Sequence, residues 1–84
     1  MLISKEGQAI TKRFFDAIEL LSSNRTIRGL KTFTDAHDIN RRNLIRVKNL
    51  PECSVLKPEW IYYLCTDYKI SASWIITGKG DMLL

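Results

Sequence analysis

The sequence predicts an all-α domain of five helices, and three observations support this fold class. Apolar residues recur at steps of three and four in successive segments, which is the period of a helix. Residue types that favour helix starts stand at the beginning of these segments. No segment carries a strand signal strong enough to build the sheet of an RNA recognition motif. With 84 residues, of which 45% are hydrophobic, the chain suits one domain over residues 1–84.

The first predicted helix covers about residues 5–22, and Ser4 is its predicted N-cap. One apolar stripe predicts its buried face: Ile10, Phe14, Ala17, Ile18 and Leu21. Polar residues elsewhere on the helical wheel are expected to face water: Lys12, Arg13, Asp16 and Glu19. The polar segment SSNR at 22–25 is expected to end the helix.

Two shorter helices are predicted over about residues 27–36 and 40–49. Thr26 and Asn40 precede them, and both are residue types that cap helix N-termini. Pro51 follows the third helix and is expected to prevent its continuation.

The fourth helix is predicted to begin at Pro58, because proline suits the first helical turn. Its apolar residues follow a helical step: Ile61, Leu64, Cys65 and Tyr68. A short fifth helix is predicted over residues 72–77, capped by Ser71 and closed by a left-handed Gly78. The apolar end at 82–84 either packs on the core or leads into a further domain, and both interpretations stay open.

Residues 27–49 separate their apolar and basic side chains onto different faces of two helices joined at 37–39. Four residues are predicted to point inward: Phe33, Ile39, Leu44 and Val47. At roughly 100° per residue, five residues of the third helix share the outer arc: Arg41, Arg42, Ile45, Arg46 and Asn49. A charged face is usually only solvated. Here the supporting helix and turn favour a helix-turn-helix that lies in a groove of DNA.

The distribution of charge agrees with this interpretation. The net charge is +4, from 13 Lys and Arg against 9 Asp and Glu. Between Arg25 and Lys48 lie seven cations and two acids, a local net charge of +5, whereas the remaining residues sum to −1. The excess positive charge therefore lies on the predicted motif, as binding to a polyanion requires.

Several other classes of protein find no support in the residues. His37 is the single histidine, and no nucleophile paired with a base, carboxylate pair or phosphate loop stands out, so no enzyme is expected. No metal, cofactor or small-molecule site is indicated. Cys53 and Cys65 are expected to be buried or idle thiols rather than a disulfide. The chain shows neither a signal peptide nor a membrane span, which predicts a cytoplasmic protein.

Aromatic residues cluster late in the chain: Trp60, Tyr62, Tyr63, Tyr68 and Trp74. Stacking on single-stranded bases is one interpretation. Their helical spacing and the weak local charge favour a role in the core or at an interface.

The order of elements and the residues at the turn resemble the lambda-repressor-like helix-turn-helix family, which includes phage repressors and xenobiotic-response-element-type regulators. The resemblance covers about residues 5–80. It rests on the apolar positions of the helix-turn-helix and on the segment DYKISASWIITGKGDM, which is similar to the segment that closes this domain in many phage repressors. Three positions depart from the pattern: Thr34 for alanine, His37 for an apolar residue and Asp38 for glycine. Aspartate tolerates the left-handed conformation better than most residues, so the turn is expected to survive.

The resemblance implies that the third helix lies in the major groove. Carried over by position, the base-reading residues are Asn40, Arg41, Arg42, Ile45, Arg46 and Asn49. The phosphate-binding residues are expected to be Thr26, Arg28, Lys31 and Lys48.

The expected function is sequence-specific binding of double-stranded DNA by a bacterial or phage transcriptional regulator of the repressor type. One half-site seldom supports tight specific binding, so a homodimer on a pseudo-palindrome is expected. The alternative is a protein-interaction module on the same fold, such as an antitoxin-like or RNA-polymerase-binding domain.

Overall fold

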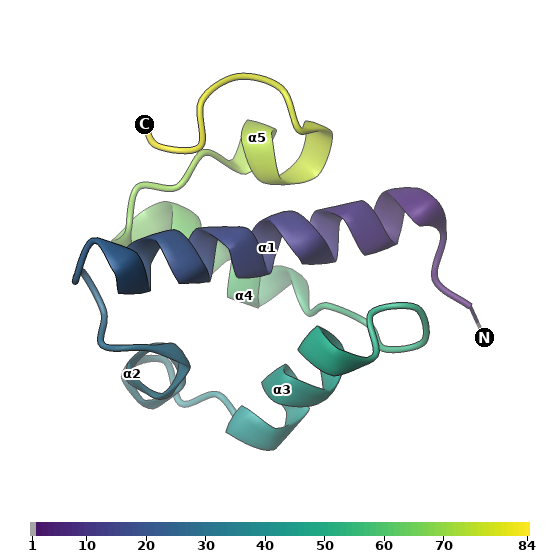
Figure 1. The fold of residues 1–84 in the computed structure, drawn as a ribbon, viewed down its shortest axis with the longest axis horizontal. Helices are drawn as coiled ribbons and strands as arrows, with labels where there is room; N and C mark the ends of the chain where they lie inside the picture. Colours follow the sequence, from purple (N-terminus) through teal and green to yellow (C-terminus); the bar gives the residue numbers. More distant parts are fainter. Residues whose placement is uncertain (1) are drawn as a thin grey trace.

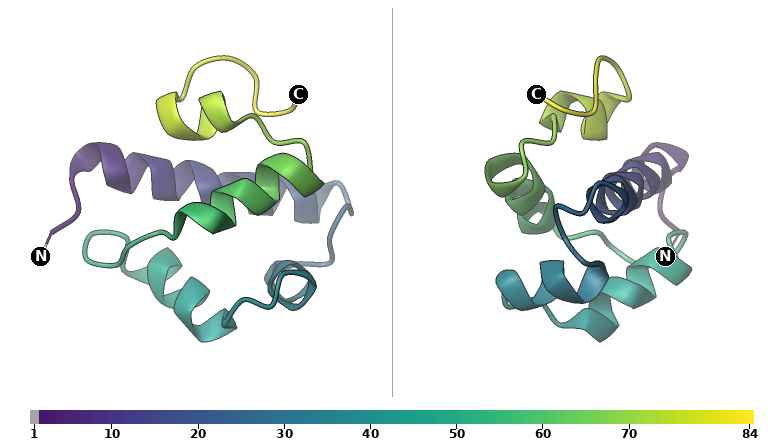
Figure 2. Two further views of the ribbon diagram at one scale, coloured as in Figure 1. Left: turned by 180° about the vertical axis from the view of Figure 1, so that it is seen from behind. Right: turned by 60° about the vertical axis from the view of Figure 1, so that its left-hand side comes forward.

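Five helices and their connecting loops make up residues 2–84, the part of the chain that the computed structural model describes. Their bounds are α1 Lys5–Ser23, α2 Leu30–Ala36, α3 Arg41–Asn49, α4 Pro58–Asp67 and α5 Ala72–Thr77. In Figure 1, α1 crosses the middle of the molecule, with α2 and α3 beneath it and α5 above it. The view from behind shows α4 against the other side of α1 (Figure 2). The predicted all-α class with five helices is confirmed.

The long helix α1 forms where the apolar stripe predicts it. The hydroxyl oxygen of Ser4 accepts a hydrogen bond from the backbone N–H of Gly7 at 3.0 Å, so Ser4 is the N-cap as expected. Four residues of the predicted stripe are buried: Phe14, Ala17, Ile18 and Leu21. Ile10, at the start of the stripe, is partly exposed. The helix ends at Ser23, one residue beyond the predicted end.

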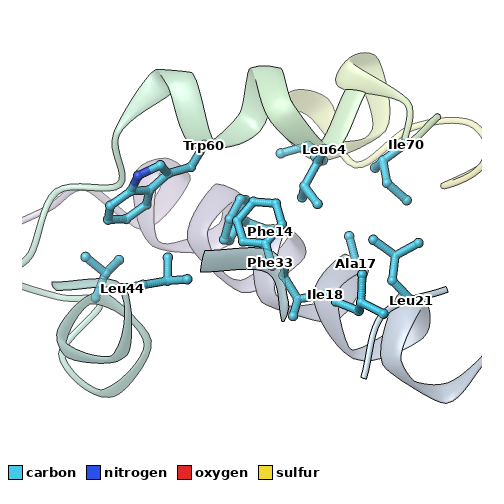
Figure 3. Packing of buried hydrophobic residues seen from close by; sticks show 12 residues of the cluster. Phe14, Ala17, Ile18, Leu21, Phe33, Leu44, Trp60, Leu64 and Ile70 are labelled. Atoms are coloured by element: carbon cyan, nitrogen blue, oxygen red, sulfur yellow. The ribbon is translucent and has the colours of Figure 1, made fainter. Parts of the chain in front are cut away.

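Aromatic rings from three helices meet at the centre of the core (Figure 3). The ring centroid of Phe14 lies 6.0 Å from that of Phe33 and 6.4 Å from that of Trp60. The other late aromatic side chains differ in burial, since Tyr63, Tyr68 and Trp74 pack partly against the core while Tyr62 is 62% exposed. Of the core or interface role expected for these residues, most therefore have the core role, and Tyr62 lies on the surface.

The start of α2 differs from the prediction. The helix begins at Leu30, with Gly29 before it at a φ of 155°, and Thr26 is not its cap. Both Thr26 and Ile27 donate their backbone N–H groups to the carbonyl of Leu21, so they continue the turn that ends α1. Thr26 and Ile27 thus belong to the end of α1, and Gly29 takes the N-cap position of α2.

The later elements begin and end where their cap residues predict. Pro58 occupies the first turn of α4, Ser71 accepts from the N–H of Trp74 at 3.2 Å, and Gly78 closes α5 at a φ of 76°. At the chain end, Met82 packs partly against the core, whereas Leu84 is 83% exposed. No helix within residues 2–84 has both the length and the apolar character to cross a membrane.

One expectation about a single residue is wrong. Arg13 does not simply face water, because its Nε donates to the carbonyl of Ile75 at 2.6 Å and its Nη2 to that of Ile76 at 3.0 Å. The guanidinium thereby satisfies carbonyls at the C-terminal end of α5, which have no partner within that short helix. Both cysteines are free thiols, as expected, with Cys53 exposed and Cys65 partly buried.

Candidate nucleic-acid interface

The helix α3 is capped at its N-terminus and has one buried and one exposed face. Asn40 Oδ1 accepts from the N–H of Asn43 at 3.2 Å, which confirms Asn40 as the N-cap. On the inner face Leu44 is fully buried and Val47 is 5% exposed. The hydrophobic contacts of these two side chains orient the helix, so its opposite face has a defined direction.

The outer face of α3 holds the residues that the helical wheel assigned to it. Five side chains are exposed there: Arg41, Arg42, Ile45, Arg46 and Asn49. Within residues 2–84, none of the three arginines has a carboxylate oxygen within 4.0 Å, and none makes a side-chain hydrogen bond. Ile45 is 37% exposed in the middle of this basic face. The predicted register is therefore confirmed, and the guanidinium groups are free to bind an anionic or hydrogen-bond-accepting partner.

The turn between α2 and α3 accommodates Asp38 and Thr34, two of the residues that depart from the family pattern. Asp38, which stands in place of the glycine of that pattern, adopts the left-handed conformation with a φ of 53°. Ile39 then donates its N–H to the carbonyl of Thr34 at 2.9 Å. Thr34 is 1% exposed, and its hydroxyl donates to the carbonyl of Lys31 at 3.0 Å, so the buried hydroxyl has a partner.

His37 attaches this turn to α4, a role that the sequence did not reveal. Its ring stacks on that of Tyr63 with centroids 4.5 Å apart and planes 9° from parallel. Its Nε2 lies 3.2 Å from the hydroxyl of Tyr68 and 3.5 Å from Oδ2 of Asp67. Burial and, to a smaller degree, the Asp67 carboxylate raise the pKa of the Tyr68 hydroxyl. The contacts of His37 thus hold the turn, and with it the start of α3, against the rest of the domain.

Three of the four predicted phosphate-binding residues lie in the loop before α2 or in its first turn, and all three are exposed: Thr26, Arg28 and Lys31. The hydroxyl of Thr26 lies 2.6 Å from Oδ1 of Asn24. Lys31 Nζ is 3.9 Å from Oδ2 of Asp35, and both side chains are about two-thirds exposed, so this ion pair is weak. Lys48 is set apart from them, because it lines a groove beside α1.

A small pocket beside α3 contains polar residues that the sequence analysis did not single out. It has a volume of about 190 Å³, and Asn43, Arg46 and Lys57 are among its lining residues. Ser54 also lines it, and the buried Oγ of Ser54 has no hydrogen-bond partner within residues 2–84. Arg46, which also belongs to the outer face of α3, Lys57 and the Ser54 hydroxyl are donors suited to an anionic oxygen. Lys57 and Ser54 lie in a loop, where no sequence periodicity could have indicated that they share a pocket with Arg46.

Within residues 2–84, no group of three or more His, Cys, Asp and Glu side chains is positioned to hold a metal ion. Comparisons of the chain with protein-family models, with curated proteins and with solved structures gave no match.

Proposed function

We propose that this chain binds double-stranded DNA sequence-specifically through α3, as part of a bacterial or phage transcriptional regulator of the repressor type. The observation that carries the proposal is the exposed face of α3, where three arginines without acidic partners surround Ile45 and Asn49. A helix held rigidly by its buried face and presenting such residues has the dimensions and chemistry to enter the major groove.

Each residue type on this face suits a particular contact. Arginine donates two parallel hydrogen bonds to O6 and N7 of guanine, and asparagine can pair with adenine. Ile45 offers an apolar surface to the methyl group of thymine. The side-chain oxygen Oδ1 of Asn40 caps the helix, so the side-chain NH2 group is the part of Asn40 that can reach a base or phosphate.

Contacts to the DNA backbone would come from both sides of α3. Arg28 lies in the loop before α2 and Lys31 lies in the first turn of α2, while Arg46, Lys57 and Ser54 line the pocket beside α3. Phosphate contacts fix the register of a protein on the duplex, and base contacts then supply the specificity. The local charge of +5 over residues 25–48 supports the same assignment.

The test is selection of preferred sites from a library of random duplexes, followed by affinity measurements on a selected and a scrambled duplex. We expect an enriched motif and tighter binding of the selected duplex. Arg41→Ala should weaken that binding, whereas Lys79→Ala removes one charge from an exposed turn outside α3 and should change it little. Selection without any enriched motif, or equal effects of the two variants, would contradict the proposal and favour an acidic protein partner for the same face.

A further inference from the structure

A groove runs along the exposed side of α1, away from the outer face of α3. It has a volume of about 830 Å³ and follows α1 from Lys5 to Ser22. At roughly 1.5 Å per residue these residues span about 26 Å, a length that suits a helix better than a compact small molecule. The apolar side chains of Phe15, Ile18 and Leu30 line it. The groove therefore offers a long, partly apolar seat for one face of another helix.

The charged residues of the groove are divided between its two ends. Lys5 and Lys12 lie in the first half of α1, and Asp16 and Glu19 lie in the second half. Ile3 donates its N–H to the carbonyl of Glu52 at 2.7 Å, which holds the loop after α3 beside the start of α1. Lys48, near the end of α3, then adds its charge to the cationic end.

This order of charges is complementary to its own reversed copy. We propose that a second copy of the chain packs its α1 antiparallel along this groove, about a two-fold axis that passes beside α1, on the groove side and level with Phe15. Lys12 and Glu19 lie about equally far on either side of that axis, so each Lys12 faces Glu19 of the second copy. Such a surface is self-complementary, as a two-fold dimer requires.

The contacts already present in one chain agree with this arrangement. Lys12 Nζ lies 2.9 Å from Oδ2 of Asp16, and the Lys12 side chain is 76% exposed, so its ammonium can bind a second carboxylate without leaving the first. Exposed ion pairs contribute little energy each, and their effect is mainly to select the orientation. Burial of the two partly exposed Phe15 rings near the axis supplies the apolar contact.

The arrangement also leaves α3 accessible in both copies. An axis perpendicular to α1 and directed toward α2 and α3, vertical in Figure 1, carries these helices onto the same side of the pair. Two α3 helices could then face one duplex. The dimer itself does not depend on DNA binding, so it is tested with the protein alone.

Sedimentation equilibrium of the full chain, from about 1 μM to about 1 mM, should show association toward twice the mass of 9.7 kDa. Lys12→Glu and Glu19→Lys should each weaken association about tenfold, because each reversal introduces two like-charge contacts per dimer. Combining both reversals should restore it, since the pairs then re-form with opposite polarity. Lys79→Glu makes the same charge change as Lys12→Glu outside the groove and should leave association unaltered.

Thermal melts of each variant identify any loss of folding, and the double reversal separates such a loss from the loss of complementarity. A chain that stays monomeric over the whole range would overturn the proposal and leave the groove to another ligand. It would be overturned equally by a dimer insensitive to both single reversals, or by a double variant no better than the single ones.

Discussion

The helices α1 and α3 both expose charged residues, but they do so in opposite ways. On α1 the cations and acids are balanced along one helix, and Lys12 pairs with Asp16 at 2.9 Å. On α3 four cations occur without any acid, and its three arginines have no carboxylate within 4.0 Å in residues 2–84. A balanced surface can match a copy of itself, whereas an unpaired surface suits a partner of opposite charge. The proposed DNA interface therefore rests on the absence of local partners for the α3 arginines rather than on the number of charges.

The largest expected effect tests which face of α3 is buried. Leu44→Ala should lower the free energy of unfolding by about 2–5 kcal/mol, because Leu44 is fully buried and its truncation leaves a cavity. Ile45→Ala, one residue later, should change it by only about 0.5 kcal/mol. Thermal and denaturant melts of both variants check this. Equal losses would show that α3 has a different register.

A smaller effect tests whether the charges of α1 have structural roles. Arg13→Ala should lower the free energy of unfolding by about 1–3 kcal/mol, since the carbonyls of Ile75 and Ile76 lose a charged donor. Lys12→Ala is the matched control, because its exposed pair with Asp16 contributes under about 1 kcal/mol. Melts in which Lys12→Ala costs as much as Arg13→Ala would contradict the role assigned to Arg13.

The third prediction separates base contacts from phosphate contacts. Arg42→Ala should reduce discrimination between a selected and a scrambled duplex by about 1–3 kcal/mol. Lys31→Ala should weaken both duplexes by a similar factor, since α2 can approach only the DNA backbone. Fluorescence anisotropy on both duplexes measures this. If Arg42→Ala weakened both equally, Arg42 would be a phosphate contact, and base reading would fall to other residues of α3.

The smallest effect concerns the cluster that holds the turn. Burial and Asp67 raise the pKa of Tyr68 above its usual value of about 10, so the folded state favours the neutral phenol. This contribution to stability is complete below about pH 10 and is lost as the pH rises through the folded pKa. Tyr68→Phe should remove that alkaline loss but cost about 0.5–1.5 kcal/mol at neutral pH, where the contact with His37 disappears.

Stability measured from neutral to alkaline pH provides the check, and Tyr62→Phe is the matched control because Tyr62 is 62% exposed. An identical alkaline profile for both variants would contradict the assignment to Tyr68.

The helices and their faces were predictable because periodicity and caps are local properties. Ser4, Asn40 and Ser71 each bond to the backbone three residues later, and Leu44 and Ile45 lie on the faces that the wheel assigned. What the sequence did not reveal depends on residues far apart. Arg13 meets a carbonyl 62 positions away, and His37 meets a tyrosine 31 positions away.

Local competition explains the error at α2. Thr26 has the chemistry of a cap, but its N–H is already bonded to Leu21 and its hydroxyl contacts Asn24. A pattern of residue types does not show which of two neighbouring helices will use a polar group. The same limit applies to Ser54, whose unpartnered hydroxyl could be recognised only after the loop was placed beside α3.

The measurement that tests the central proposal most directly is the salt dependence of binding to a selected duplex, titrated between about 50 and 200 mM salt. Counterion release gives a slope of log affinity against log salt of about −0.9 for each phosphate contacted. With contacts from Arg28, Lys31 and the pocket of Arg46 and Lys57, we expect a slope of about −3 or steeper per chain. A flat dependence, or no binding at the lowest salt, would contradict DNA binding by α3.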